Sequence, residues 1–371
     1  MDNRQLKMKY SYLLAFCFLI IGCSDPVEPD LHVVVNEADI LKESFPNKNW
    51  MWVRNDAKAT DEELNQKFKK LVEHGFSGVL IAGDHERMFR AAKSAGLETH
   101  IWMWTMNRGD KEIMDNHSDW YAINRKGESC HDKPPYVGYY RWLCPTKKPV
   151  RNFLKEQVKQ LVAKDYIDGI HLDYVRHCDV ILPRALWEKY GLVQDHEMPE
   201  YDYCYCDDCK SHYMSADYGG ARFLSPSLEK DPPSKQEWVQ YRSDMITEVV
   251  NELAAVCHAA GKPISAAVFP TPAIAKKLVR QDWLKWDLDM VFPMVYHVFY
   301  EEKLSWVNTA TKEGVDSLNG AIPYYTGLYM PDLKTAPQLD TAIVNALTAK
   351  ANGFCLLGEL TKSQWEVLRN H

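Results

Sequence analysis

Short apolar segments alternate with amphipathic helical segments along most of the chain. The apolar segments with the length of buried strands are residues 49–55, 77–83, 98–106, 168–176, 263–269, 289–297, 321–329 and 353–360. The segments between them carry helix signals, such as Thr60 and Glu63 in the spacing of a capping box, with Gly75 as the stop. Eight strand and helix units in succession predict an α/β fold, a single (β/α)8 barrel of the TIM type, over residues 46–371. No glycine-rich phosphate motif follows the first strand, which argues against a dinucleotide-binding fold.

Two connections are much longer than the others. One follows the third predicted strand, at about residues 107–143, and the other follows the fourth, at about residues 177–233. Both leave the C-terminal ends of strands, where barrel enzymes build their active sites. We therefore expect these loops to form the walls of a cleft at the barrel mouth.

The composition excludes some classes of partner. Hydrophobic residues make up 46% of the chain and charged residues 26%, as in ordinary globular proteins. The formal net charge is −7, and the sequence contains no long run of lysine or arginine that would attract nucleic acid. We therefore expect no nucleic-acid partner.

Residues 1–22 have the features of a targeting segment. Basic residues precede the apolar stretch YLLAFCFLII, which is short for a membrane span. The stretch ends in IIGC, which resembles the bacterial lipobox, so Cys23 would be the lipidated N-terminus. Residues 23–45, which include SDPVEPD, would then form an acidic tether. The resemblance implies a lipoprotein anchored in the outer membrane or at the cell surface. A plain cleaved signal or a single membrane anchor is the alternative.

The fourth predicted strand carries a carboxylate inside an apolar run. In DGIHLDYVR, the two-residue period of a strand places Gly169, His171 and Asp173 on one face. If this face points into the barrel, Asp173 lies near the C-terminal mouth. Because uncompensated burial of an ionised carboxylate is unfavourable, Asp173 must be paired, hydrogen-bonded or used in chemistry.

Three segments resemble one family. DGIHLDYVR is similar to the fourth-strand motif of the family 10-like glycosyl hydrolases, a bacterial group of TIM-barrel proteins. WVQYRSDMITEVVNELAAV resembles the W-x-x-Y/F-R-x-x-x-I-T helix of this group, and RQDWLKWDLDMVFPMVYH resembles its Q-D-W…D-x-x-x-P-M-x-Y segment. The resemblance implies cleavage of carbohydrate, with Asp173 as the nucleophile or base.

Glycoside hydrolysis usually needs a second carboxyl group as the acid. Four carboxylates follow predicted strands, namely Asp84, Glu301, Asp332 and Glu359. Glu359 is the first choice, because the apolar FCLLG before it could desolvate it as a general acid requires. Glu301, on the loop after PMVYH, is the second choice, and either residue could instead have a purely structural role. The fifth strand carries no carboxylate, so the alpha-amylase arrangement is not reproduced.

Aromatic residues are frequent on the predicted strands. The C–H faces of sugar rings pack on aromatic side chains, while sugar hydroxyls need polar partners. Strand alternation requires some of these rings to pack in the core instead. The residues expected to contact a carbohydrate substrate are Trp102, Trp104, Tyr174, Tyr296 and Tyr325, together with the polar His171, Arg176, Asn107 and His297.

The second long loop contains a cluster of metal-ligand residue types. In CYCDDCKSH these are Cys204, Cys206, Cys209 and His212. Three thiols and an imidazole could hold a structural zinc ion. Outside the cytoplasm disulfide bonds are one alternative, with Cys144 or Cys178 as partners, and free thiols are another. Because four protein ligands would leave no open position on the metal, we expect no catalytic cofactor.

The sequence therefore predicts a lipid-anchored glycoside hydrolase that cleaves an extracellular or periplasmic poly- or oligosaccharide. The alternative is a surface glycan-binding lipoprotein, a barrel with an aromatic cleft but no catalysis. A third hypothesis, a metal-dependent hydrolase or deacetylase, needs a cluster of histidine and aspartate at the mouth. His171, His177 and Asp173 are too few for such a cluster and lie partly on opposite faces.

Overall fold

The computed structural model describes residues 45–56, 58–215, 235–369 and 371. The predicted signal segment, the lipidation site Cys23 and almost all of the predicted tether lie outside these residues. Among the helices of the described part, none combines the length and the apolar character that a bilayer crossing requires.

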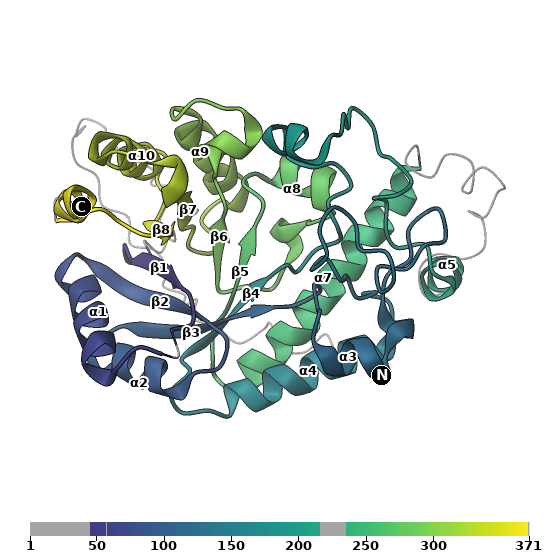
Figure 1. Ribbon diagram of the computed structural model, residues 1–371, viewed down its shortest axis with the longest axis horizontal. Coiled ribbons are helices and arrows are strands. Elements are labelled where there is room, and N and C mark those ends of the chain that lie inside the picture. Colours follow the sequence, from purple (N-terminus) through teal and green to yellow (C-terminus); the bar gives the residue numbers. More distant parts are fainter. Residues whose placement is uncertain (1–44, 57, 216–234, 370) are drawn as a thin grey trace, which may run out of the picture. The chain divides into compact units, whose positions relative to one another are not determined.

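Eight parallel strands form the centre of the fold (Figure 1). They are β1 Asn49–Val53, β2 Phe76–Ala82, β3 Glu98–Trp104, β4 Gly169–Asp173, β5 Ile264–Val268, β6 Met290–Pro293, β7 Thr326–Tyr329 and β8 Phe354–Leu357. The continuous ladder runs in the order β6-β5-β4-β3-β2-β1-β8-β7. Bridges from Val291 to Tyr324 and from Met294 to Gly327 join β6 to β7 and close the barrel. The predicted (β/α)8 fold is confirmed, and each predicted strand segment overlaps an observed strand.

Helices follow the strands and surround them (Figure 1). The longer ones are α1 Asp61–Glu73, α2 Glu86–Ser94, α4 Lys148–Val162, α7 Gln236–Ala259, α8 Pro272–Val279, α9 Trp306–Leu318, α10 Ala336–Thr348 and α11 Lys362–Leu368. The predicted capping box of Thr60 and Glu63 begins α1, since each side chain bonds the backbone N–H of the other residue. Thr335 and Gln338 begin α10 in the same way.

The barrel interior is filled by large rings. Trp50 packs edge-on against Phe292, with ring centroids 5.4 Å apart, and Phe292 lies 5.1 Å from Tyr325. Neighbouring strands leave room for these rings by presenting glycine, because a Cβ atom on Gly78 would lie 2.3 Å from the Trp50 ring. A Cβ atom on Gly169 would in the same way lie 2.5 Å from His100. Ring size and glycine position are thus matched across adjacent strands.

The two long loops pack against each other. The loop after β3 contains the short helix α3, Lys111–Asn116, and the loop after β4 contains α5, Asp207–Met214. Asn124 pairs with Tyr203 across the loops, and the Tyr205 N–H donates to the carbonyl of Ile123 at 2.7 Å. The two segments lie together in blue and teal on the right of Figure 1. The predicted loops therefore form one structural unit beside the barrel mouth.

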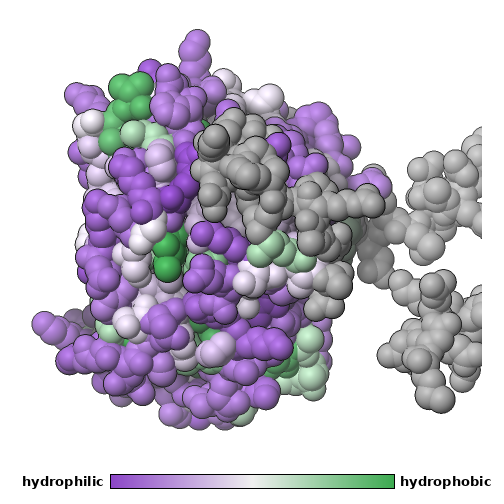
Figure 2. Space-filling view, turned by 90° about the vertical axis from the view of Figure 1, so that its right-hand side faces the viewer, coloured by the Kyte–Doolittle hydropathy of each residue, from purple (hydrophilic) through white to green (hydrophobic). Residues whose placement is uncertain are grey.

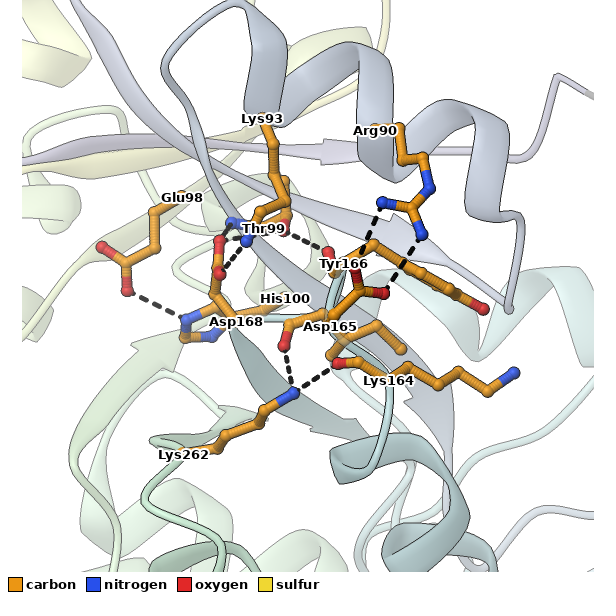
Figure 3. A network of polar contacts seen from close by, with 11 residues as sticks. Arg90, Lys93, Glu98, Thr99, His100, Lys164, Asp165, Tyr166, Asp168 and Lys262 are labelled. Carbon is orange, nitrogen blue, oxygen red and sulfur yellow. Dashed lines mark hydrogen bonds and ion pairs between the residues drawn. The ribbon is translucent and has the colours of Figure 1, made fainter.

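A polar network joins the elements at the opposite, N-terminal end of β3 and β4 (Figure 3). Asp168, just before β4, accepts hydrogen bonds from the backbone N–H and the hydroxyl of Thr99, both at 3.0 Å. The Lys262 ammonium, just before β5, donates to the carbonyls of Lys164 and Ile167, both at 2.5 Å. These bonds fix the ends of three adjacent strands relative to each other, far from the mouth.

Gly78→Ala tests the match between rings and glycines. We expect the unfolding free energy to fall by about 1–3 kcal/mol, because the added methyl group would overpack against Trp50, which is fully buried. Denaturant unfolding measures the change. Gly138→Ala is the control, since a Cβ atom there meets nothing within 4 Å. Equal stability of the two variants would contradict the packing argument.

Glu98→Gln tests the charge network at the base of β3. Burial alone would raise the pKa of Glu98, but contacts with His100 at 3.0 Å and Lys48 at 2.5 Å hold this pKa at about 2. The wild type should therefore exceed the variant in unfolding free energy above pH 4.5, by about 1–2 kcal/mol after solvent screening. This advantage should disappear as the pH falls towards 2. Denaturant unfolding across this range measures it, and a constant difference would contradict the assignment.

Candidate active site

Asp173 ends β4 at the barrel mouth and is held on both carboxylate oxygens. The Trp102 indole N–H donates to Oδ2 at 2.8 Å, and the backbone N–H of Tyr174 donates to Oδ1 at 2.6 Å. Burial raises the pKa of Asp173, while these two donors and the positive charge of Arg176 oppose the rise. The structure thus places Trp102, a predicted substrate-binding residue, against Asp173, and the two donors fix the direction of the carboxylate.

The backbone directly after Asp173 is unusual. Tyr174 has a φ of 49°, in the left-handed region that residues with side chains rarely adopt. This conformation turns the chain out of the strand and aims the Tyr174 N–H at the carboxylate. The Tyr174 ring lies 4.7 Å from the Trp104 ring, so the turn also positions an aromatic contact.

Aromatic side chains from β3 and its loop form one wall of the mouth. Trp104 pairs with Asp173 in the register of β3 and β4, and 43% of its surface is exposed. Tyr139 lies 6.1 Å from the Trp104 ring and is 52% exposed. These are the most exposed of the described aromatic side chains near Asp173, as a surface that packs on sugar rings requires.

Four predicted substrate-binding residues are instead buried. His171 is fully buried; it accepts from the Trp52 indole N–H at 3.0 Å and contacts the Ser265 hydroxyl at 2.9 Å. Since its Nε2 is an acceptor, the neutral ring carries its proton on Nδ1 and donates it to Ser265. Burial and the neighbouring His100 hold the pKa of His171 well below its ordinary value. This environment does not fit the predicted contact with sugar hydroxyls.

Tyr325, Asn107 and Arg176 are the other three. Tyr325 belongs to the ring-filled interior, and Asn107 binds the backbone N–H of Arg141 at 2.8 Å inside the loop after β3. Arg176 pairs with Asp179 at 2.8 Å and lies over the Trp142 ring at 4.6 Å. Each of these residues is at most 6% exposed, so they support the mouth from behind and do not line it.

The two carboxylates preferred as the acid are both exposed. Glu359 follows β8, and its side chain is open to solvent, so the desolvation expected for it is absent. Glu301 is 58% exposed and faces Arg184 of the loop after β4 at 3.6 Å. Asp84 is bound by Lys164 and by the Tyr166 hydroxyl at 2.8 Å, which hold its pKa below the ordinary value against the effect of burial. None of the three has the environment of a general acid.

Asp332, after β7, has that environment. It is half-buried, and its Oδ2 has no hydrogen-bond partner among the described residues. Burial raises the pKa of Asp332, with the positive charges of His297 and Lys334 opposing the rise. Burial also lowers the pKa of His297, and the negative charge of Asp332 opposes this lowering. Asp332 and His297 therefore form a desolvated pair of titratable groups at the ends of β7 and β6.

Tyr296 connects Asp332 with Asp173. Its ring lies 5.2 Å from Tyr329, at the end of β7, and its buried hydroxyl has no hydrogen-bond partner among the described residues. Burial, followed by the charges of nearby acidic groups that include Asp173, raises the pKa of Tyr296. Tyr296 and His297 are consecutive, and they lie within range of the charges of Asp173 and Asp332 respectively.

A pocket of about 990 Å³ adjoins the mouth at the ends of β1, β7 and β8. Its lining includes Trp52, Tyr329 and Glu359, and continues to Trp365 on α11. Asp173 is not part of the lining, but Tyr329 lies against both the pocket and Tyr296. The pocket thus extends from the side of the mouth that faces away from β4.

Sequence reasoning missed two features of this region. Tyr139, Tyr140 and Trp142 form the aromatic wall with Trp104, and the aromatic run YYRW in the long loop was the available signal. The thiols of Cys204, Cys206 and Cys209 lie together as expected, but the fourth group beside them is the thiol of Cys144 and not the imidazole of His212. Contacts between the two loops decide the second feature, and neither loop predicts it alone.

An eight-stranded barrel with a carboxylate and aromatic rings at its C-terminal mouth defines a TIM-barrel protein of the glycosidase type. The family model of glycosyl hydrolase-like 10 matches residues 66–341. The chain therefore belongs to the glycosyl hydrolase-like 10 family, as the motifs predicted. No curated protein matches the sequence.

Solved structures with the same fold include several glycosidases. The glycoside hydrolase domain of PgaB (BpsB) from Bordetella bronchiseptica superposes with a TM-score of 0.65 at 12% identity, covering 87% of this chain and 98% of that one. The catalytic domain of the beta-amylase from Paenibacillus polymyxa gives 0.57 at 12% identity, with 86% and 94% covered. A beta-galactosidase from Rahnella sp. R3 gives 0.54 at 9% identity, with 86% and 52% covered. At these identities the likeness establishes the fold.

Trp102→Phe tests the electrostatics of Asp173. Removal of the indole N–H takes away a donor to Oδ2, so the pKa of Asp173 should rise further above its ordinary value. Carbon-13 NMR titration of aspartate-labelled protein measures this pKa, with Asp173→Asn to assign the signal. Trp104→Phe is the control, because the Trp104 indole makes no hydrogen bond to Asp173. An unchanged pKa in Trp102→Phe would contradict the assignment.

The same raised pKa has a consequence for stability. The folded state binds the Asp173 proton more tightly than the unfolded state does. The unfolding free energy of the wild type relative to Asp173→Asn should therefore be highest at low pH and fall as the pH rises through the pKa of Asp173.

Proposed function

We propose that the protein is a glycoside hydrolase in which Asp173 and Asp332 are the two catalytic carboxyl groups. The observation that carries the proposal is the environment of Asp173, a carboxylate with a raised pKa, fixed by two N–H donors at an aromatic barrel mouth. Membership in a glycosyl hydrolase-like family and the glycosidase neighbours support the same chemistry.

Asp173 acts as the nucleophile or base in this proposal. Its two hydrogen bonds orient the carboxylate, and each oxygen keeps a free lone pair that can face a water molecule or the anomeric carbon. A base is most effective when its pKa lies near the working pH, and burial moves the pKa of Asp173 in that direction.

Asp332 replaces Glu359 and Glu301 as the proposed acid. An acid must hold its proton until the leaving oxygen needs it, and the burial that raises the pKa of Asp332 provides this. His297, beside it, and the unpartnered hydroxyl of Tyr296 are placed to bind a sugar hydroxyl between the two carboxyl groups.

The substrate in this proposal is a poly- or oligosaccharide. Trp104 and Tyr139 offer exposed ring faces on one side of Asp173, and the pocket beside Tyr329 offers space on the other. A chain of several sugar units could therefore occupy both sides of the cleavage point. The predicted signal segment and the predicted lipidation at Cys23 support a lipid-anchored enzyme outside the cytoplasm, at the outer membrane or the cell surface.

Asp173→Asn and Asp332→Asn test the proposal. The full chain is assayed for release of reducing ends from a panel of polysaccharides, and the variants are then compared on the substrate found. We expect each variant to lose about 10²–10⁴-fold in kcat, the usual contribution of a general acid or base. The pH profile of the wild type should be bell-shaped, with the acidic limb set by Asp173 and the alkaline limb by Asp332.

Matched controls keep this test specific. Glu359→Gln and Glu301→Gln remove exposed carboxylates at the same mouth and should retain most of the wild-type activity. A large loss in Glu359→Gln with full activity in Asp332→Asn would refute the choice of acid. Binding of a glycan without any cleavage, unchanged by Asp173→Asn, would refute hydrolysis and favour the glycan-binding alternative.

A further inference from the structure

Four cysteine thiols from two distant parts of the chain meet in the interior of the loop region. Cys144 lies at the end of the loop after β3, while Cys204, Cys206 and Cys209 lie in the loop after β4. The four sulfur atoms lie within 4.8 Å of one another. The Cys144 sulfur is 3.5 Å from that of Cys206 and 3.4 Å from that of Cys209. All four side chains are buried, so the thiols enclose a small volume that water does not reach.

The spacing of the sulfur atoms fits a shared metal ion. Four thiolates at about 2.3 Å from a zinc ion stand about 3.8 Å from each other in a tetrahedron. A disulfide bond would bring two sulfur atoms to about 2.05 Å. The observed separations of 3.4 and 3.5 Å are therefore close to those in a tetrahedral site and too long for a covalent bond.

Hydrogen-bond donors lie close to several of the sulfur atoms. Cys206 is the N-cap of α5 and Cys209 lies in its first turn, where free backbone N–H groups stabilise thiolates. The backbone N–H of Ile123 donates to the Cys204 sulfur at 3.4 Å. The Thr146 hydroxyl lies 3.2 Å from the Cys209 sulfur. Four thiolates and one Zn²⁺ carry a net charge of −2, which these donors and the neighbouring Lys147 offset in part.

We propose that Cys144, Cys204, Cys206 and Cys209 bind one zinc ion in a structural site. Soft thiolate ligands in a tetrahedral arrangement select zinc over harder divalent cations, and four protein ligands leave no position for substrate. The His212 ring lies 5.9 Å from the ring of Tyr241 and takes no part in the ligand set. The site replaces the ligand set predicted from the sequence by one that includes a residue from the other loop.

The zinc site would fasten together the two loops that form the mouth. Trp142, two residues before Cys144, lies under the Arg176 guanidinium at 4.6 Å and beside the Tyr174 ring at 5.8 Å. The face shown in Figure 2, the right-hand side of Figure 1, is largely hydrophilic where it is coloured, with small separate hydrophobic spots. Beneath the surface the two loops pack through buried residues that include Tyr121, Tyr203 and Tyr205, and a metal ion would add a direct link between the loops. This inference does not depend on the proposed hydrolase activity.

Metal analysis of the full chain tests the site. The protein is produced with zinc in the medium and purified without chelator, and its zinc content is measured by mass spectrometry. We expect one zinc ion per chain in the wild type and loss of that zinc in Cys144→Ser. His212→Ala should keep the metal, because His212 is not part of the cluster. Cys130→Ser should also keep it, because Cys130 is a buried cysteine of the loop after β3 that lies outside the cluster. Replacement by Co²⁺ should give the absorption of a tetrahedral tetrathiolate site.

Cysteine alkylation of the wild type provides a second measurement, because Cys144→Ser could fail to fold. The four cluster cysteines should resist alkylation together and should react together after chelation, with a lower Tm. Cys257, buried on α7, should stay protected after chelation and serves as the control. Metal-free native protein with a disulfide bond between cluster cysteines would overturn the proposal. Loss of zinc in His212→Ala with retention in Cys144→Ser would overturn the ligand set.

Discussion

The packing of large rings inside the barrel determines where chemistry can occur. Trp50, Phe292 and Tyr325 fill the interior, and above them Trp52 donates a hydrogen bond to His171. His171 uses its other nitrogen on Ser265, so Trp52, His171 and Ser265 satisfy one another across β1, β4 and β5. Asp173 is the next inward-facing residue on β4 and the first that solvent reaches. The filled interior thus makes Asp173 the floor of the mouth.

The orientation of the Asp173 carboxylate depends on loop residues as well as on the strands. Asp173 depends on Trp102 of β3 and on the left-handed backbone of Tyr174 for its orientation. Tyr174 in turn packs against Trp142 and Arg176, and the charge of Arg176 is matched by Asp179. A buried pair of this kind adds little net stability, but it leaves few alternative arrangements for the side chains around it. The position of the carboxylate therefore reflects the packing of two loops as well as the strand that carries it.

The sequence predicted well what neighbouring residues determine. Strand positions follow from local apolar runs, the inward face of β4 from a two-residue period, and the start of α1 from the Thr60 capping box. The depth of each side chain could not be predicted in this way. His171 shares a face with Asp173 but lies one step deeper, where the interior is already full.

The paths of the loops could not be predicted from the local sequence either. β8 ends at Leu357, and Gly358 turns the chain with a φ of 126°, so Glu359 points to solvent although an apolar run precedes it. Cys144 joins the other thiols only because the two long loops pair through Asn124 and Tyr203. Both outcomes depend on contacts between segments that are far apart in the chain.

The proposed hydrolase gives different roles to two aspartates at the mouth, and the environments of these two side chains differ. Asp173 and Asp332 are both desolvated, yet Asp173 has two N–H donors on its oxygens, while one oxygen of Asp332 has no partner among the described residues. Donors stabilise the ionised form, so they favour the carboxylate at Asp173, whereas an unpartnered oxygen leaves burial as the main influence on Asp332. A nucleophile or base and an acid need this difference. In the proposed hydrolase, the hydrogen bonds of Trp102 and Tyr174 favour the ionised form of Asp173, as the role of nucleophile or base requires.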